Sequence, residues 1–297
     1  MIHEWIKKIK DKIGQSKVVT RFAPSPTGYL HMGHIGSAVL TYIISKHLQG
    51  TLILRIEDHD QSRCRQKYCE TITNDLDWLG LKFHKTYRQK ENPERYLLAI
   101  KNLSHSKRLY HCSCSRKQIK LLSTGVGEEL HYSGVCREKG LPDNGNSLRL
   151  WINNSSISFE DLRHGKLTQT PADQCGDIVL KDRQKQWTYQ FAVVADDIAD
   201  GVNLVIRGDD LLNSTGRQIM LSKLIKPDSH INYLHHPLIN DTDGKKLSKR
   251  FLSTSVKQLR AQGYSAEAVI GRALYEMQIT PSANPINLAD LGEFLNG

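Results

Sequence analysis

The chain contains 297 residues, and its 41 Lys or Arg residues outnumber its 31 Asp or Glu residues, which gives a formal charge of +10. This length is sufficient for one large domain with an insertion or for two domains, and the basic excess favours a polyanionic partner such as a nucleic acid. No run of about eighteen apolar residues is present, so no membrane-spanning helix is expected. Because the N-terminus also lacks the apolar core of a signal peptide, a cytoplasmic protein is expected.

The first predicted element is a short basic amphipathic helix within residues 1–16. Lysines occupy much of its circumference, and one face carries isoleucines at helical spacing, namely Ile2, Ile6, Ile9 and Ile13. We interpret this segment as an extension that packs against the core. Contact with a membrane surface or with RNA is the alternative.

An unusual stretch, residues 21–36, follows a short apolar strand that is predicted at residues 17–22. Two prolines hold its backbone extended, and glycines, including Gly33, leave room for a second molecule to approach. His31 and His34 then lie at the start of a helix, whose unpaired N–H groups favour an anion such as phosphate. For two histidines alone, an incidental placement or part of a metal site would be alternative interpretations.

A second strand, predicted at residues 51–57, ends in a charged run, and helices are predicted at residues 64–79 and 92–106. In an open parallel sheet, ligands bind beyond the carboxyl ends of the strands. Glu57 is therefore a candidate site residue. A solvated loop carboxylate is the alternative for this position.

Cysteines interrupt the alternation of strands and helices between residues 110 and 140. The chain has six cysteines, at positions 64, 69, 112, 114, 136 and 175, and in a cytosolic protein a metal site is favoured over disulfides. Cys112, Cys114 and Cys136 offer three thiolates, and tetrahedral zinc needs a fourth ligand, for which spacing alone suggests His131 or His111. A closed site would be structural and would order an inserted subdomain too small to fold alone. Three cysteines without a metal are the alternative.

Further strands are predicted at residues 147–151, 156–159 and 177–181, and we expect them to complete the insertion. An apolar segment then precedes Asp196 and Asp197. This pair could bind Mg²⁺, act in acid–base chemistry, cap a turn or simply be hydrated, and no role is assigned to it. The remaining predicted elements are a strand at 203–207, a helix at 214–226, a strand at 233–239 and a helix at 265–277.

Two separated motifs carry a resemblance to a known class of enzymes. His-Met-Gly-His at residues 31–34 and Lys-Leu-Ser-Lys at residues 246–249 resemble the paired ATP-binding motifs of class I aminoacyl-tRNA synthetases. The resemblance is closer to the glutamyl-tRNA synthetase family. It is carried, in order, by RFAPSPTGYLH at 21–31, LRIED at 54–58, YQFAVVADD at 189–197 and VIRG at 205–208.

Within this family the chain most resembles the short paralogues, the glutamyl-Q tRNA(Asp) synthetases, because the stretch after Arg250 is too short for an anticodon-binding half. The resemblance covers residues 17–250 and implies an α/β fold with a Rossmann-like parallel-sheet catalytic core. It divides the chain into the extension at 1–16, core halves at 17–108 and 176–250, an inserted zinc-containing subdomain at 109–175, and a short helical C-terminal segment at 251–297.

The resemblance also implies roles for individual residues. ATP would be bound by His31, Gly33, His34 and Lys249, and catalysis would use His31, His34, Lys249 and Lys246. Glutamate would be bound by Arg21, Phe22, Ala23, Pro24, Ser25, Glu57, Tyr189 and Arg207. Glu57 would take the α-ammonium group, and the planar fork of Arg21 the side-chain carboxylate. Alternatively, Arg207 would form a salt bridge with Asp209 or Asp210. Cys-x-Cys followed by Tyr-x-x-x-Cys matches the short paralogue and points to Tyr132 as the fourth zinc ligand.

The implied reaction is activation of L-glutamate by ATP and Mg²⁺ to glutamyl-AMP, without tRNA, followed by transfer to the queuosine base at the wobble position of tRNA(Asp). This is a tRNA modification by a ligase-type paralogue with structural Zn²⁺, and a monomer is expected. The alternatives are a truncated glutamyl-tRNA synthetase that charges the 3′ end of tRNA(Glu), and a catalytically silent tRNA-binding paralogue. The chain contains neither a Walker A motif nor a G-x-G-x-x-G after a strand, which disfavours other nucleotide-binding enzymes.

Overall fold

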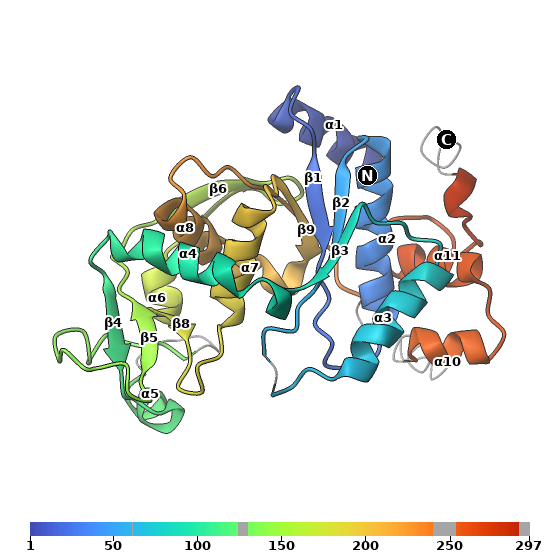
Figure 1. The fold of residues 1–297 in the computed structure, drawn as a ribbon. Helices are drawn as coiled ribbons and strands as arrows, with labels where there is room; N and C mark the ends of the chain where they lie inside the picture. The colour runs from blue at the N-terminus through green and yellow to red at the C-terminus, as the bar shows by residue number, and fades with distance from the viewer. Residues whose placement is uncertain (61, 124–129, 240–253, 291–297) are drawn as a thin grey trace.

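The computed structural model describes residues 1–60, 62–123, 130–239 and 254–290 of the chain. Two groups of parallel strands form its centre (Figure 1). The first group has the order β1 (Val19–Phe22), β2 (Thr51–Ile56) and β3 (Lys85–Arg88). The second group pairs β9 (Leu204–Gly208) with β10 (Asn232–His236).

The two groups meet edge to edge at β1 and β9. The backbone N–H of Asn203 donates to the carbonyl of Val19 (3.1 Å), and the N–H of Val19 donates to the side chain of Asn203 (2.9 Å). The spatial order is therefore β3-β2-β1-β9-β10, which is the order of a doubly wound parallel sheet. Four of these strands were predicted, whereas β3 was not, because its residues are mostly polar and exposed.

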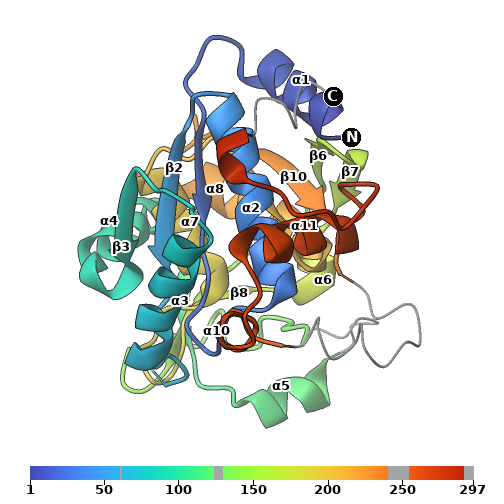
Figure 2. The ribbon, with the colours of Figure 1, turned by 90° about the vertical axis from the view of Figure 1, so that its right-hand side faces the viewer.

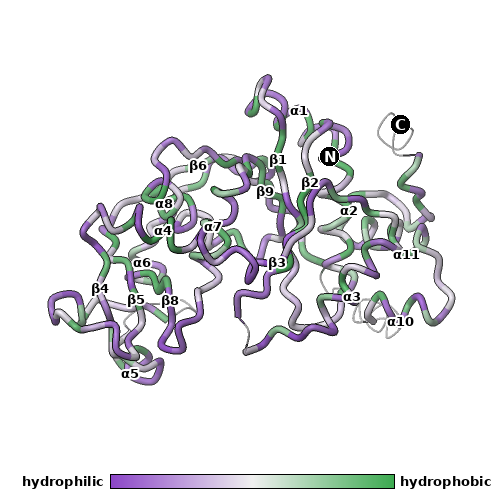
Figure 3. The backbone as a smooth tube through the Cα atoms, in the orientation of Figure 1, coloured by the Kyte–Doolittle hydropathy of each residue, from purple (hydrophilic) through white to green (hydrophobic). Residues whose placement is uncertain are grey.

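Helices cover both faces of this sheet (Figure 1). One face carries α2 (Met32–His47) and α3 (Gln66–Trp78), and the other carries α4 (Pro93–Ser104), α7 (Tyr189–Ala199) and α8 (Thr215–Ile225). Each group of helices encloses an apolar cluster, and the peripheral loops are mostly hydrophilic (Figure 3). None of the helices in the described ranges is both long and apolar enough to cross a membrane.

The N-terminal extension forms α1 (Ile2–Ile13), as predicted. Its apolar face joins the main core cluster through Ile2, Trp5, Ile6 and Ile9, which are buried. Lys8 Nζ donates to the carbonyl of Leu162 (3.3 Å), and Lys12 Nζ pairs with Glu160 (2.6 Å). The expectation that this helix packs against the core is confirmed, and Trp5 adds to the predicted face.

The predicted insertion contains two separate sheet regions. Strands β4 (Leu109–Cys112), β5 (Ser147–Leu150) and β8 (Ile178–Lys181) form an antiparallel sheet beside α5 (Arg116–Leu122) and α6 (Pro171–Cys175). By contrast, β6 (Ile157–Asp161) and β7 (Gly165–Gln169) form a hairpin that extends the central sheet, because β6 pairs with β10. The strand predicted at 156–159 therefore belongs to the central sheet and not to the insertion. Strand β8 does belong to the antiparallel sheet of the insertion, although it lies beyond residue 175, the predicted end of the inserted subdomain.

Of the two C-terminal helices, one packs on α2 and the other on α3 (Figure 2). They are α10 (Val256–Ala261) and α11 (Ala266–Glu276), and the latter agrees with the helix predicted at 265–277. The remaining short 3₁₀ helices are η1 (Gln89–Glu91), η2 (Asp209–Ser214) and η3 (Leu288–Asp290). Val269, Ala273 and Leu274 are fully buried in the main core cluster, so this segment is an integral part of the core.

Gly271 of α11 lies where the C-terminal segment packs closely against this helix. A Cβ atom at this position would clash with the backbone carbonyl of Asn284 and would lie 3.3 Å from the Cα of Pro285. Since backbone cannot move aside as a side chain can, we expect Gly271→Ala to lower the free energy of unfolding by about 1–3 kcal/mol, despite the better helix propensity of alanine. Gly28→Ala, which would meet no atom within 4 Å, is the control. Thermal and urea unfolding measure both, and equal midpoints would contradict this packing.

Candidate active site

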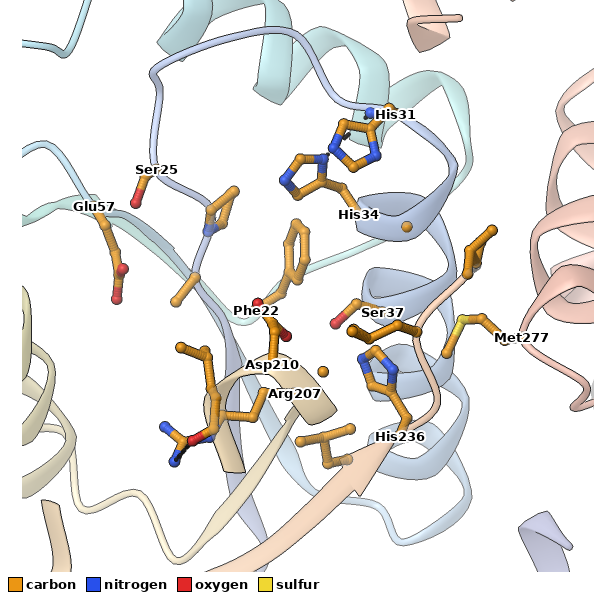
Figure 4. A pocket seen from close by; sticks show the side chains of 18 of the residues that line it. Phe22, Ser25, His31, His34, Ser37, Glu57, Arg207, Asp210, His236 and Met277 are labelled. Carbon is orange, nitrogen blue, oxygen red and sulfur yellow. Dashed lines mark hydrogen bonds between the residues drawn. The ribbon is translucent and has the colours of Figure 1, made fainter. Parts of the chain in front are cut away.

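A cavity of about 430 Å³ opens where the carboxyl ends of β1, β2, β9 and β10 converge (Figure 4). This is the edge at which ligands bind in open parallel sheets. The structure brings many predicted site residues to its wall: Arg21, Phe22, Ala23, Pro24, Ser25, His31, Gly33, His34, Glu57, Tyr189 and Arg207. Lys246 and Lys249 lie outside the described residues.

Arg21, at the end of β1, is almost completely buried and holds one carboxylate of the protein. Its Nε donates to Asp197 Oδ1 (3.0 Å). Within the described ranges, Nε is the only guanidinium nitrogen of Arg21 with a hydrogen-bond partner. The two terminal nitrogens are therefore available to a ligand carboxylate in the cavity.

Arg207, at the end of β9, is held by neutral acceptors. Its guanidinium donates to His235 Nε2 (2.9 Å), Thr215 Oγ1 (2.9 Å) and Gln218 Oε1 (2.5 Å). His235 Nδ1 in turn bonds Asp161 Oδ2 (2.7 Å), and burial lowers the pKa of His235, so the ring is neutral and can accept from Arg207. This arrangement orients Arg207 but leaves its charge available to a ligand.

The predicted alternative for Arg207, a salt bridge with Asp209 or Asp210, is not what the structure contains. Asp209 pairs with Arg163 (2.5 Å) and with His164 (2.7 Å). Asp210 lines the cavity and has no ion pair with Arg207. The reason is that the Arg207 guanidinium is held by His235 of β10 and Gln218 of α8, and its contact with the following 3₁₀ helix is to the backbone carbonyl of Leu211 (3.4 Å).

Glu57 and Tyr189 complete the polar end of the cavity. Burial raises the pKa of Glu57, and the nearby Arg55 opposes this effect. Burial also raises the pKa of Tyr189, the first residue of α7, so its phenol remains protonated near neutral pH. The cavity therefore presents cations, a carboxylate and a phenol within one enclosed space, which suits a zwitterionic ligand.

The two imidazoles at the start of α2 lie together at the other end of the cavity (Figure 4). Their ring centres are 3.9 Å apart, and His34 Nδ1 accepts a hydrogen bond from the backbone N–H of His31 (3.3 Å). In the neutral ring of His34 the proton is consequently on Nε2. Burial lowers the pKa of both rings, that of His34 to about 4. Near neutral pH they are uncharged donors beside a helix N-terminus.

Several cavity residues were not predicted from the sequence. An apolar side is formed by Ile206, Leu238, Ile239 and Met277, and the ring of His236 lies against it (Figure 4). The Nδ1 of His236 bonds the carbonyl of Pro237 (2.9 Å), which fixes the ring. No local pattern marks Met277 as a site residue, since only the packing of α11 on α2 brings it there.

Both carboxylates of the acidic pair make contacts within the protein. Asp196 accepts hydrogen bonds from Tyr96 (2.9 Å), Gln89 (2.8 Å) and Arg95 (3.1 Å), whereas Asp197 binds Arg21 and Arg55. Both carboxylates are buried and satisfied by protein groups. The earlier alternatives of an Mg²⁺ site, acid–base chemistry or a turn cap do not apply to this arrangement.

Comparison with known proteins identifies the family. Residues 17–286 match the family described as tRNA synthetases class I (E and Q), catalytic domain. The chain belongs to this family. Similar proteins are the glutamate–tRNA ligases of Legionella pneumophila (strain Lens; 36% identical over 260 residues), Aquifex aeolicus (35% over 269) and Lawsonia intracellularis (38% over 261). The matches cover 85–86% of this chain and 55–56% of each relative, so the chain spans about half the length of these relatives.

Solved structures of class I synthetases share the fold. The glutamate–tRNA synthetase from Elizabethkingia anophelis has a TM-score of 0.74 and 25% identity, over 95% of this chain and 70% of that chain. The methionyl-tRNA synthetase from Mycobacterium tuberculosis, 10% identical, shows the same fold with a TM-score of 0.54. The predicted α/β fold with a Rossmann-like parallel-sheet core is confirmed, as is the resemblance to glutamyl-tRNA synthetases.

The second feature of this synthetase-family chain is a group of thiols near α5. The Sγ atoms of Cys112, Cys114 and Cys136 all lie within 4.8 Å of one another, and Cys114 and Cys136 are 3.6 Å apart. Tetrahedral zinc with Zn–S bonds of about 2.3 Å places sulfurs roughly 3.8 Å apart, so this group fits the ion. The hydroxyl oxygen of Tyr132 lies 3.2 Å from Cys112 Sγ and 3.9 Å from Cys114 Sγ.

Neither of the two histidines considered as fourth ligands belongs to this group of thiols. His131 Nε2 bonds the carbonyl of Ala172 (2.9 Å), and His111 Nε2 lies 3.4 Å from Asp143. Among the residues that the structure describes, only the three cysteines form a group with metal-ligand spacing. Tyr132 is therefore the nearest candidate for the fourth position.

Replacement of Cys112 and Cys114 by Ser tests this site. Because a structural zinc ion needs thiolate ligands, we expect purified wild-type protein to contain about one zinc per chain and the double variant to lose it. Elemental analysis by mass spectrometry gives the content, with Cys64→Ser and His131→Ala as controls that should retain zinc. Unchanged zinc in the double variant would remove the metal from this position.

Proposed function

We propose that this chain activates L-glutamate with ATP to form glutamyl-AMP and pyrophosphate. One observation carries the proposal: a single cavity joins two buried guanidinium groups and a buried carboxylate to a helix N-terminus that bears two neutral imidazoles. The first set matches an amino acid with two carboxylates and one ammonium group. The second matches a phosphate chain.

In this proposal the two ends of the cavity bind different parts of the reactants. Glu57 binds the α-ammonium group, and the free terminal nitrogens of Arg21 bind the side-chain carboxylate. Arg207 and Tyr189 complete the amino-acid site. Residues 22–25 form the wall between β1 and the imidazoles, and Gly33 leaves space for ATP.

The chemistry is the attack of an α-carboxylate oxygen on the α-phosphorus of ATP. The new bond joins oxygen to phosphorus, the bond to the bridging oxygen breaks, and pyrophosphate leaves. No general base is required, because the carboxylate is ionised near neutral pH. His31 and His34 would donate to the phosphate oxygens as negative charge develops, and Lys246 and Lys249 are proposed as cations. Preorganised donors of this kind contribute about 3–4 kcal/mol each, and Mg²⁺ would accompany ATP.

For the acceptor, we propose queuosine in tRNA(Asp). The supporting observation is the Tyr132 hydroxyl among three thiols, since Cys-x-Cys with Tyr-x-x-x-Cys is the pattern by which the chain resembles the short paralogues. The second candidate is charging of tRNA(Glu), which the relatives named glutamate–tRNA ligase favour. In both cases the activation step is the same.

The role of Arg21 can be tested by Arg21→Lys, which keeps the charge but loses the planar fork. A lysine cannot hold Asp197 and a ligand carboxylate in the same geometry, so we expect the KM for glutamate to rise roughly 10–100-fold. The KM for ATP should change little, which provides an internal control. A near-normal glutamate KM would show that Arg21 does not bind the substrate carboxylate.

The function itself is tested by glutamate-dependent exchange of pyrophosphate into ATP in the absence of tRNA. Labelled glutamate is then offered to tRNA(Asp), with and without queuosine, and to tRNA(Glu). Exchange without tRNA and labelling only of queuosine-containing tRNA(Asp) are the expected results. Labelling of tRNA(Glu) would establish the second candidate, and no exchange under any condition would leave a tRNA-binding paralogue.

A further inference from the structure

Two charged residues, Arg55 and Asp197, connect Arg21 and Glu57 of the cavity wall without lining the cavity themselves. Asp197 Oδ1 accepts hydrogen bonds from Arg21 Nε (3.0 Å) and from Arg55 Nη1 (2.7 Å). The other terminal nitrogen of Arg55 pairs with Glu57 Oε1 (3.2 Å). Arg55 is completely buried, and 6% of the Asp197 side chain is exposed. The four residues form a continuous chain of ionic contacts from β1, through α7 and β2, to the loop after β2.

The geometry of this chain is restrictive. A guanidinium group is planar, and its two terminal nitrogens have a constant separation, so Arg55 sets how far Asp197 lies from Glu57. Asp197 then orients Arg21, a residue of the cavity wall, through Nε, and no hydrogen bond within the described ranges occupies the terminal nitrogens of Arg21. Glu57 is also anchored by its backbone N–H, which donates to the carbonyl of Pro24 (3.0 Å).

We propose that Arg55 and Asp197 are positioning residues for amino-acid recognition, which hold the carboxylate-binding Arg21 and the ammonium-binding Glu57 at the separation that L-glutamate requires. The inference rests on the proposed function, because it takes Arg21 and Glu57 as ligand-binding groups. It assigns a role to Asp197 and to the buried Arg55, neither of which takes part in the activation chemistry.

The bridge also determines the charge state of Glu57. The ionisable groups that act on Glu57 are Arg55, His59, Arg21, Asp197 and Tyr189, from both neighbouring strands, α7 and the loop after β2. Burial raises the pKa of Glu57, Arg55 lowers it and Asp197 raises it. Loss of the Arg55 charge therefore moves protonation of Glu57 to higher pH, and loss of the Asp197 charge moves it to lower pH. Protonated Glu57 cannot pair with an ammonium group.

The experiment measures binding of L-glutamate and, separately, of ATP by titration calorimetry between pH 5 and pH 8. For Arg55→Lys we expect the Kd for glutamate to rise about tenfold at pH 7.5, with the Kd for ATP within about twofold of wild type. In wild type, glutamate affinity should fall as the pH is lowered and Glu57 becomes protonated. For Arg55→Gln, the pH at which this fall occurs should be higher than in wild type. For the isosteric Asp197→Asn, the pH of this fall should be lower than in wild type. The ligand's own carboxylates titrate identically in every variant, so these differences report on Glu57.

Arg95→Lys is the matched control, because Arg95 also pairs with two acidic residues, Asp196 of α7 and Asp200 at its end (both 3.1 Å). Within the described part of the chain, Arg95 has no hydrogen bond or ion pair with a residue of the cavity wall. This substitution should lower the unfolding temperature and leave the glutamate Kd within about twofold. If Arg55→Gln does not fold, Arg55→Lys and Asp197→Asn still decide the question. The inference would be overturned if the Arg55 and Asp197 variants lost glutamate binding and ATP binding equally. It would also be overturned if the pH at which glutamate affinity falls moved in the same direction for Arg55→Gln and Asp197→Asn.

Failure of the inference is distinguishable from failure of the proposed function. If the wild-type protein binds no L-glutamate under any condition, the proposed function is wrong and the positioning role falls with it. If the wild type binds glutamate and the Arg55 and Asp197 variants match Arg95→Lys, only the positioning role is wrong. In that case the buried contacts contribute to stability alone.

Discussion

Burial of charge at the carboxyl edge of the sheet is the constraint on which the cavity depends. Arg21, Arg55, Glu57 and Asp197 are each at most a few per cent exposed, and an isolated charge in such a place costs several kcal/mol. Each charge therefore requires its partner, and the partners come from β1, β2 and α7. These elements cannot shift relative to one another without breaking an ion pair, so the polar end of the cavity has a defined shape before any ligand enters.

The two cations of the cavity differ in how they are supported. Arg21 shares the negative charge of Asp197 with Arg55, whereas Arg207 is oriented by neutral acceptors and by the neutral His235, which Asp161 holds. A cation surrounded by neutral acceptors keeps its attraction for an anion in the cavity. Among the described residues, the cavity thus offers one cation that is paired with a carboxylate and one that is bound by neutral groups, and this asymmetry suits a ligand whose two carboxylates have different roles in a reaction.

Regions outside the sheet edge contribute through packing. Helix α11 places Met277 on the apolar side of the cavity, and the β6–β7 hairpin supplies Asp161, the group that orients His235. The thiol group near α5 has a small apolar cluster of its own, whereas Leu150 of β5 and Leu180 of β8 in the same antiparallel sheet belong to the core of α4, α7 and α8. The backbone of Tyr132 connects this cluster to the neighbouring segment through hydrogen bonds with Cys175 and Asp177. Metal binding there would order this sheet without a direct effect on the cavity.

Local patterns in the sequence determined much of the fold, because apolar periodicity and breaker residues specify strands and helices over short distances. They predicted the strands that end at the cavity, the start of α2 and the amphipathic α1, and ordered motifs marked many residues that lie in the cavity wall. Tertiary structure alone decided the pairing of Asp197 with Arg21 and Arg55, the placement of β6 beside β10, and the approach of Met277. These contacts join residues far apart in the chain, and their partners depend on three-dimensional packing that no local periodicity records.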